Sequence, residues 1–443
     1  MKLLKRFVPW LLLVLLFLVA YFNYPKLTII SGYASKSMAS TVFISHRSSQ
    51  SVIESDHNIP LIKLAEVESR PKMATATFFG LMERKTICRE GLGCVLINDK
   101  HALKTNIPTP HREALQNDLP FPYGNNGSKD TLFDNVDYDQ LKRTLDSVFV
   151  AIETSKTRTV LVAYKNQIIA ERYADGFTEE TPILGWSMTK SILATLYGIL
   201  EHQGKLDLNS YTSIASWQND ERKHITFNHL LRMQSGLEWE EDYSKISDVT
   251  RMLFLNSDMT TAQMEKNAIA RPTEIWNYSS GTTNLLSGIL RKQFETHQEY
   301  VDFPYAALID KIGMHSMIIE ADMTGNFVGS SYAWANTRDW AKFGLLYLNK
   351  GNWNGTQLFS SAWVDYIKRP TLNSDGTYGA HFWLNAEGKY PDVPRDLFSA
   401  NGFQGQRVFI IPSKDLVVVR TGISDGSVFD INTFLKDIIA SID

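Results

Sequence analysis

Cysteine is almost absent from this sequence, which has two in 443 residues. Two cysteines exclude a disulfide-stapled scaffold and a zinc site built from four thiolates. No pair of the ten histidines has the His-Glu-x-x-His spacing of a zinc hydrolase, and neither the GxxxxGK[ST] nor the GxGxxG phosphate-binding pattern occurs. We therefore expect no bound metal and no cofactor.

An excess of one charge is also absent. Lys and Arg number 45 against 48 Asp and Glu, for a formal net charge of −3. Nucleic-acid binders normally carry a basic excess, so we expect no nucleic-acid partner. Hydrophobic residues at 44% and charged residues at 21% are close to the globular average, which excludes disordered and fibrous classes. The length leaves room for two or three domains and a large core.

The N-terminus carries an uncharged run of 19 residues from Phe7 to Pro25, preceded by Lys2, Lys5 and Arg6. As a helix this run spans roughly 28 Å, about the hydrocarbon thickness of a bilayer. The cations in front keep the terminus cytoplasmic by the positive-inside rule. We predict a single-pass signal anchor in the inner (cytoplasmic) membrane, with the remainder on the periplasmic side.

A cleaved signal peptide is the alternative for this segment. Cleavage sites follow shorter apolar regions and carry small residues, whereas this run ends in Tyr21-Phe22-Asn23-Tyr24-Pro25. Gly32-Tyr33-Ala34 offers a more distant site. We favour the uncleaved anchor, with the membrane as a partner through the N-terminal helix.

Export changes the interpretation of Cys88 and Cys94. Five residues with two glycines separate them, so a local disulfide can form in an oxidising compartment. Two unpaired thiols are the alternative. Because the loop is short, the entropic contribution of the bond is modest, and we predict a local structural role.

The rest of the chain divides near a segment rich in proline and glycine, Ile107 to Asp130. Before it, residues 26–106 contain strand-like pieces such as Thr41–Ile44 and Cys94–Ile97. We predict three parts: an anchor at 1–25, an exported N-terminal region and linker at 26–130, and a main domain at 131–443. The pattern does not decide whether residues 26–106 pack on the main domain or hold it off the membrane.

The two ends of the main domain mirror each other. Leu141, Leu145, Val148 and Phe149 have helical spacing and precede a hairpin of 159–164 and 168–173. A second hairpin, 408–411 and 416–420, precedes an amphipathic helix with Phe434, Leu435, Ile438 and Ile439. We predict an α+β fold: one antiparallel sheet flanked by the terminal helices, with a large, mainly helical insertion over about 187–370.

The pattern Ser-x-x-Lys occurs twice. In Ser69-Arg70-Pro71-Lys72 the proline disfavours a helical turn, so we expect solvated loop. Ser187-Met188-Thr189-Lys190 instead begins an amphipathic run that ends at Gly204, which predicts a helix of about four turns.

That helix places Ser187 and Lys190 on one side, one turn apart. A serine at a helix start gains from the free N–H groups there, and desolvation favours the neutral amine of a buried lysine, which can accept the serine proton. The alternative is that Ser187 only caps the helix and Lys190 is a surface cation.

Two further motifs follow. Asn277-Tyr278-Ser279-Ser280-Gly281 precedes another helical run, and a phenol beside a serine–lysine pair can relay a proton. Asn401-Gly402-Phe403-Gln404-Gly405-Gln406 precedes the 408–411 strand, and its glycines mark close backbone approach or a bulge. Either motif alone is weak.

Together and in this order, the three motifs resemble the serine β-lactamase and penicillin-binding-protein superfamily. The likeness is greatest to the class C-like branch that includes 6-aminohexanoate-dimer hydrolases and related esterases, and it runs from about Asp137 to the C-terminus. Segments that carry it are Gly185–Ser191, Leu231–Leu237, Tyr278–Gly281, Arg338–Gly344 and Gly405-Gln406.

The resemblance implies the β-lactamase/transpeptidase-like fold and a role for each motif. Ser187 would be the acylated nucleophile, Lys190 its proton acceptor and Tyr278 the general acid and base. The oxyanion hole would use the backbone N–H groups of Ser187 and Phe403, with Ala400 as the alternative donor. We expect substrate contacts from Trp186, Ser280, Gly402 and Gln404.

Departures from the family pattern bear on the substrate. The third motif of β-lactamases carries a cation for the antibiotic carboxylate, and Gly402-Phe403-Gln404 carries none. Arg420-Thr421-Gly422 resembles that motif but falls at the end of the last strand, and Ser280 stands where many class C relatives have Asn. These departures disfavour β-lactam hydrolysis.

We therefore predict a membrane-anchored, exported serine hydrolase that cleaves a small ester or linear amide. The alternatives are a module of the same fold that binds penicillin or peptidoglycan peptides without turnover, or a β-lactamase. An α/β-hydrolase is disfavoured because its Gly-x-Ser-x-Gly turn needs glycine where Thr189 stands.

Overall fold

The structure is a computed structural model that describes residues 2–98, 101–104, 106–113, 119–124, 127, 129, 132–150, 155–424 and 428–442. It forms two compact units. The N-terminal unit comprises Met1–Arg89, Cys94–Leu103 and Glu240–Ser257, and the C-terminal unit comprises Glu90–Gly93, Lys104–Trp239 and Asp258–Asp443. Part of the predicted linker, residues 114–118, 125–126, 128 and 130, lies outside the described residues.

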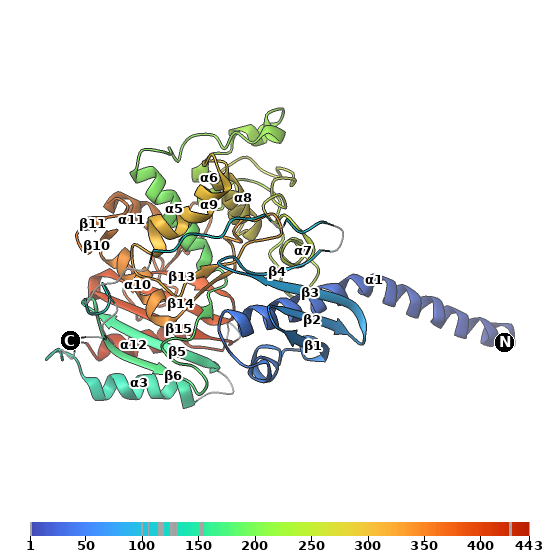
Figure 1. Cartoon of the computed structure of the whole chain (residues 1–443), viewed down its shortest axis with the longest axis horizontal. Helices are drawn as coiled ribbons and strands as arrows, with labels where there is room; N and C mark the ends of the chain where they lie inside the picture. Colours follow the sequence, from blue (N-terminus) through green and yellow to red (C-terminus); the bar gives the residue numbers. More distant parts are fainter. Residues whose placement is uncertain are drawn as a thin grey trace. The chain divides into compact units, whose positions relative to one another are not determined.

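The N-terminal unit consists of one long helix and an antiparallel meander in the order β1-β2-β3-β4 (Figure 1). The helix packs on β2 and β3 and also contacts α7. The elements are α1 (Lys2–Phe43), α2 (Ser49–Ser51), η1 (Val52–Asp56), η2 (Ile62–Leu64), β1 (Ala65–Arg70), β2 (Met73–Phe78), β3 (Leu81–Arg89), β4 (Gly93–Leu96) and α7 (Asp248–Leu255).

The second half of α1 is largely buried within the N-terminal unit. Ile30, Ala34 and Met38 recur every four residues and are at most 8% exposed. The Ser35 hydroxyl donates to the Ala74 carbonyl oxygen at 3.0 Å and lies 2.8 Å from Thr86 Oγ1. The strand predicted at 41–44 is therefore wrong, because burial against the sheet keeps the chain helical through Phe43.

The predicted anchor, residues 1–25, falls within the first part of α1 apart from Met1, which lies outside the described residues. Within the described part of the chain, no helix is both long enough and apolar enough to cross a membrane.

A disulfide joins Cys88 at the end of β3 to Cys94 in β4, with the two Cα atoms 3.8 Å apart. It closes the turn between the two strands, and Cys94 is fully buried beside Met38 and Ala74.

The first Ser-x-x-Lys lies in the same sheet. Ser69 belongs to β1 rather than to a loop, and Lys72 lies in the turn that leads to β2.

The C-terminal unit is built on a six-stranded sheet in the order β12-β13-β14-β15-β5-β6, antiparallel throughout. The pairing of β15 with β5 joins the two predicted hairpins into one sheet and confirms the α+β prediction. The strands are β5 (Thr157–Tyr164), β6 (Gln167–Tyr173), β12 (Trp383–Leu384), β13 (Phe398–Gly402), β14 (Gln406–Ile411) and β15 (Leu416–Gly422).

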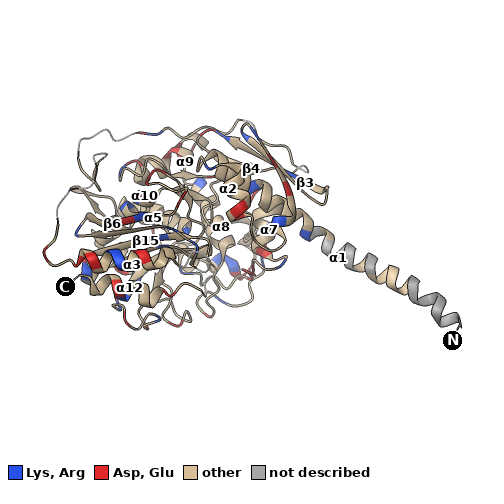
Figure 2. Ribbon diagram, turned by 90° about the horizontal axis from the view of Figure 1, so that it is seen from below, with Lys and Arg blue, Asp and Glu red and all other residues tan. Residues whose placement is uncertain are grey.

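Helices cover both faces of this sheet, as Figure 1 shows. Alternate side chains of β5 explain the arrangement: Val160 and Val162 join a core with α3 (Tyr138–Val150) and α12 (Ile431–Ala440), whereas Leu161 and Ala163 face the core of α5 and α10 (Thr337–Leu348). Acidic and basic residues alternate along the exposed side of α3 (Figure 2).

The connection between the hairpins is mainly helical. One part of it, Glu240–Ser257 with α7, belongs to the N-terminal unit, a feature that the sequence pattern did not predict. The remaining elements are β7 (Ile183–Leu184), α5 (Met188–His202), η3 (Ala215–Trp217), η4 (Glu221–His224), α6 (Phe227–Leu231), α8 (Ser280–Arg291), α9 (His297–Pro304), η5 (Tyr305–Ile309), β8 (Ile318–Ile319), β9 (Ala333–Ala335), β10 (Asn352–Trp353), β11 (Thr356–Gln357), α11 (Ser361–Lys368), η6 (Phe403–Gly405) and η7 (Pro412–Lys414).

Candidate active site

Ser187 lies between β7 and the first turn of α5. Its hydroxyl makes no capping hydrogen bond to the helix, although Ser187 occupies the capping position. Instead it accepts a hydrogen bond from Lys190 Nζ at 3.0 Å. The serine oxygen is therefore paired with an amine and is not used to terminate the helix.

The turn before Ser187 is tightly constrained. Trp186 adopts φ = 47°, a left-handed conformation that costs energy for a residue with a side chain. A Cβ on Gly185 would lie 2.4 Å from the Trp340 ring, and a Cβ on Gly402 would lie 2.0 Å from the Gly185 carbonyl oxygen. The third motif therefore meets the turn of the first by backbone-to-backbone contact, which only glycine permits.

Lys190 is 1% exposed and donates to three oxygens. These are Ser187 Oγ at 3.0 Å, Ser280 Oγ at 2.9 Å and the Ser330 carbonyl oxygen at 2.9 Å. A neutral amine has two N–H donors and one lone pair. It would keep its bonds to Ser280 and Ser330 and turn the lone pair to the hydroxyl of Ser187, which is the geometry of a proton acceptor.

The second motif supplies two neighbours of this amine. Ser280, the first residue of α8, is fully buried, so the structure places it against Lys190. The Tyr278 ring lies 5.0 Å from Lys190 Nζ and is half-buried. It packs against Tyr378 and Trp383, with ring centroids 5.8 and 5.4 Å away.

The third motif ends β13 and turns through η6. The Phe403 ring is 40% exposed and meets the edge of Trp186 at 5.6 Å. Gln404 follows with φ = 58°, whereas Ala400 is fully buried in β13. The placement of β13 against the Ser187 turn agrees with an oxyanion donor from this motif, and the assignment to Phe403 remains a prediction.

Arg420 belongs to the framework, as its position at the end of the last strand implied. It donates to the Gly405 carbonyl oxygen at 3.0 Å and to Thr157 Oγ1 at 2.9 Å. Its guanidinium lies 4.4 Å from the Phe429 ring. These contacts hold the η6 turn to β5, away from Ser187 chemistry.

Arg407 is a cation beside the third motif that no sequence pattern indicated. Arg407 in β14 is paired with Asn401 of β13, and its Nη1 donates to the Gly402 carbonyl oxygen at 2.7 Å. Burial lowers the pKa of Arg407, and the phenols of Tyr390 and Tyr278 oppose that shift. The third motif itself contains no cation, but Arg407 of the neighbouring strand lies close to Tyr278. The lack of a cation in the motif is therefore a weaker reason to disfavour anionic substrates.

His381 ties together the helices that carry the site. Its Nδ1 lies 2.6 Å from the Leu231 carbonyl oxygen, so Nδ1 carries the proton and Nε2 accepts from the Thr283 hydroxyl at 2.9 Å. Its own carbonyl accepts from Ser191, next to Lys190. Burial, together with the nearby charge of Lys190, lowers the pKa of His381 to about 3.

This low pKa predicts a pH-dependent stability. Below pH 6.5 the His381 side chain binds a proton in the unfolded state, whereas in the folded state it stays neutral down to about pH 3. The free energy of unfolding therefore falls as the pH decreases from 6.5 to 3. We expect a loss of about 2 kcal/mol between pH 7 and pH 5 from this group. His381→Asn, which tolerates the left-handed backbone, should lose that much less than the parent in urea unfolding at the two pH values. An unchanged pH dependence would contradict the assignment.

Comparisons with known proteins identify the family to which this fold and site correspond. The Beta-lactamase family model matches residues 151–428. A 6-aminohexanoate-dimer hydrolase from Paenarthrobacter ureafaciens is 22% identical over 312 residues, which cover 64% of this chain and 77% of that protein.

Solved structures give the same fold. A protein assigned as a 6-aminohexanoate-dimer hydrolase from Bacillus anthracis aligns with a TM-score of 0.57 and 23% identity, over 70% of this chain and 84% of that one. EstCE1, a hydrolase with promiscuous acyltransferase activity, aligns with a TM-score of 0.55 and 14% identity, over 69% and 99% of the two chains.

Proposed function

The chain belongs to the Beta-lactamase family and is a serine hydrolase, and from this premise we propose that it cleaves small esters or linear amides through an acyl-enzyme on Ser187. The observation that carries the proposal is the hydrogen bond between Ser187 Oγ and the buried Lys190 Nζ. A hydroxyl that only capped α5 would not need this partner.

The proton transfers close into a cycle. Lys190 takes the Ser187 proton as Oγ attacks the substrate carbonyl, and Tyr278 gives its proton to the departing oxygen or nitrogen as the C–O or C–N bond breaks. Water then attacks the acyl carbon and returns a proton to Tyr278, and Lys190 returns its proton to Ser187. The backbone N–H groups of Ser187 and Phe403 would bind the oxyanion in both steps.

The substrate class rests on the surroundings of Ser187 and on relatives. Trp186 contacts Phe403 and Tyr278 contacts Trp383, and these aromatic rings suit an acyl or leaving group with apolar surface. A linear-amide hydrolase and an acyl-transferring hydrolase are among the similar proteins. Because Arg407 adds a cation near Tyr278, a β-lactam remains the second candidate.

Covalent labelling tests the function directly. The full chain in detergent is treated with a fluorophosphonate and digested, and the labelled peptide is identified by mass spectrometry. We expect the label on Ser187, together with turnover of a short p-nitrophenyl ester. Turnover of a linear ω-aminoacyl amide and of nitrocefin is compared in parallel. A folded protein that is not labelled would favour a module that binds without turnover.

Tyr278→Phe should reduce turnover of the p-nitrophenyl ester and of the amide by about two orders of magnitude or more, the usual effect of removing a general acid–base group. The ring keeps its packing on Trp383, so the fold should persist. Steady-state kinetics measure the loss, and it should be greater for the amide, whose amine needs a proton to leave. Equal rates for variant and parent would move the role to another group.

We also propose that residues 1–25 anchor the enzyme in the cytoplasmic membrane with the C-terminal unit on the periplasmic side. Lys2, Lys5 and Arg6 precede the apolar run, and the described side chains from Trp10 to Leu15 are 52–72% exposed on α1. Exposed apolar side chains in such a row need a cover, and lipid provides one.

Membrane fractionation provides the test. The full chain should stay in the pellet after alkaline carbonate, and protease added to spheroplasts should degrade it. A chain starting at Lys26 that remained equally membrane-bound would contradict the proposal.

A further inference from the structure

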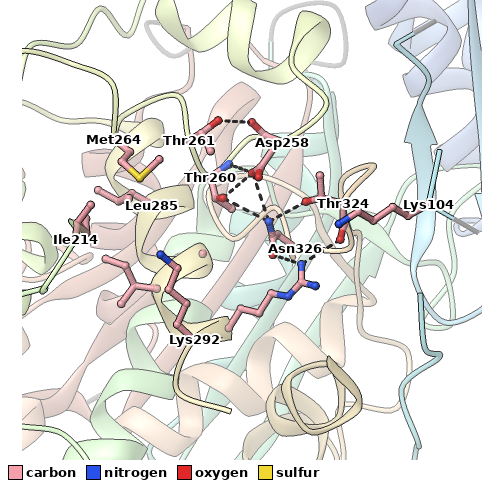
Figure 3. A pocket seen from close by; sticks show the side chains of 13 residues that line it. Lys104, Ile214, Asp258, Thr260, Thr261, Met264, Leu285, Lys292, Thr324 and Asn326 are labelled. Atoms are coloured by element: carbon pink, nitrogen blue, oxygen red, sulfur yellow. Dashed lines mark hydrogen bonds between the residues drawn. The ribbon is translucent and has the colours of Figure 1, made fainter. Parts of the chain in front are cut away.

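A cavity of about 500 Å³ lies at the end of α8 farthest from the candidate active site (Figure 3). Its wall comes from the last turns of α8, the 258–264 segment, the 324–326 turn, Ile214 and Lys104. Ser187, Lys190 and Tyr278 do not line it. Since Ser280 begins α8 and Arg291 ends it, the cavity is a separate site, with a volume in the usual range for small-molecule pockets.

The wall has two chemically different sides. Met264, Leu285 and Ile214 form an apolar side in Figure 3, and Thr260, Thr324 and Asn326 form a polar side opposite. A ligand that fills the cavity therefore needs an apolar body and a polar head. Neither a free inorganic ion nor a pure hydrocarbon would satisfy both sides.

Three cations mark the polar head as an anion. Lys104, Arg291 and Lys292 all line the cavity. Arg291 Nη1 donates to the Thr324 carbonyl oxygen at 3.1 Å and to Asn326 Oδ1 at 2.9 Å, so the guanidinium reaches across the wall to neutral acceptors. Within the described residues, none of the three cations forms an ion pair with a carboxylate.

Two of these positive charges, on Arg291 and Lys104, lie close enough to act on one group. Burial lowers the pKa of the nearby His297, and the positive charges of Arg291 and Lys104 lower it further. Cations in the last turn of a helix commonly offset its dipole. An interaction with the helix dipole explains Lys292. It does not explain Arg291, which binds the 324–326 turn instead of its own helix end, or Lys104, which lies outside α8.

Acidic groups offset only part of this positive charge. Among the lining residues Asp258 is the only acid, and its Oδ1 is taken by the backbone N–H of Thr260 at 2.9 Å and the Thr260 hydroxyl at 2.6 Å. Asp322, which does not line the cavity, accepts from backbone N–H groups of Met259 and Asn326. With three cations and one acid in its lining, the cavity presents a net positive charge beside an apolar surface.

We propose that this cavity binds a small amphiphilic anion, a carboxylate or phosphate monoester on an aliphatic body. The anionic head would lie beside Arg291 and Lys104, where charge-assisted hydrogen bonds are strongest, and Lys292 would add positive charge from the other side of the wall. The chain would pack on Met264 and Leu285. The site is independent of the chemistry at Ser187.

Calorimetric titration of the purified full chain tests the proposal. Hexanoate and hexyl phosphate are compared with hexanol, hexylamine and inorganic phosphate. We expect one of the two amphiphilic anions to bind with a one-to-one ratio, at least about tenfold more tightly than any of the three controls. Hexanoate and hexyl phosphate also distinguish the two head groups.

Charge reversals locate the binding. Lys292→Glu should weaken binding of the anion by about tenfold or more. Lys311 is also exposed but does not line the cavity, so Lys311→Glu should bind like the parent. Lys104→Glu repeats the test on a different segment. Turnover of p-nitrophenyl esters should be the same in all three variants. Anion binding that is absent, matched by hexanol, or unaffected in both Lys292→Glu and Lys104→Glu would overturn the proposal.

Discussion

Ser187→Ala should reduce ester turnover by roughly 10⁴-fold or more and abolish fluorophosphonate labelling. The reason is that no acyl-enzyme can form without Oγ, while the oxyanion donors and the binding surface persist. The hydroxyl makes no helix cap, so its removal should leave the thermal stability within a few degrees of the parent. Burst kinetics and intact-mass measurement of the acyl-enzyme provide the readout.

The chain offers a matched control for this variant. Ser69 heads the other Ser-x-x-Lys, but it lies in β1 and Lys72 lies in a turn, so the two do not share a helix face. Ser69→Ala should therefore turn over and label like the parent. Loss of activity in Ser69→Ala, or retained activity in Ser187→Ala, would reject the nucleophile.

Lys190→Ala should slow acylation by about three orders of magnitude or more, because no other described amine contacts Ser187 Oγ. Stopped-flow release of p-nitrophenol under single-turnover conditions measures that step. Circular dichroism and thermal melting must show that the fold survives, since Lys190 also donates to Ser280 and Ser330.

Lys190→Arg separates charge from proton transfer. A guanidinium keeps the positive charge but does not lose its proton, so it cannot accept one from Ser187. We expect Lys190→Arg to be nearly as slow as Lys190→Ala. An arginine variant that acylated at the parental rate would show that Lys190 acts only as a fixed charge.

Local patterns predicted the parts of the fold that depend on neighbours in sequence. The helical spacing of Leu141, Leu145 and Phe149 predicted α3, and the two strand-like runs 159–164 and 168–173 predicted the β5–β6 hairpin. The three-residue spacing of Ser187 and Lys190 likewise placed them on one helix face. The family resemblance read from these motifs is confirmed by the match over 151–428.

Contacts between distant segments could not be predicted in the same way. The Ser330 carbonyl that binds Lys190 is a backbone group, so no residue type signals it. Arg407 becomes a neighbour of the third motif only through strand pairing with Asn401. The helix through Thr41 and Phe43 was missed because its small, β-branched residues are held helical by packing.

The assignment of Glu240–Ser257 to the N-terminal unit could not be predicted from local patterns either. Its helix α7 begins with an ordinary capping box at Ser247 and resembles any other helix of the middle region. Only its contact with α1 assigns it to the other unit. The two units are therefore linked by several chain crossings.

The pairing of β5 with β15 has a consequence for synthesis. Thr159 and Thr421 share a hydrogen bond of 2.7 Å although 262 residues separate them. The ribosome must release nearly the whole chain before β5 can pair with β15, so this sheet is completed only after translation. Until then the apolar faces of β5 and β6 stay open, and a chain stalled before β13 would lack both the sheet and the third motif. Molecular chaperones in the compartment where the chain emerges would act during this interval.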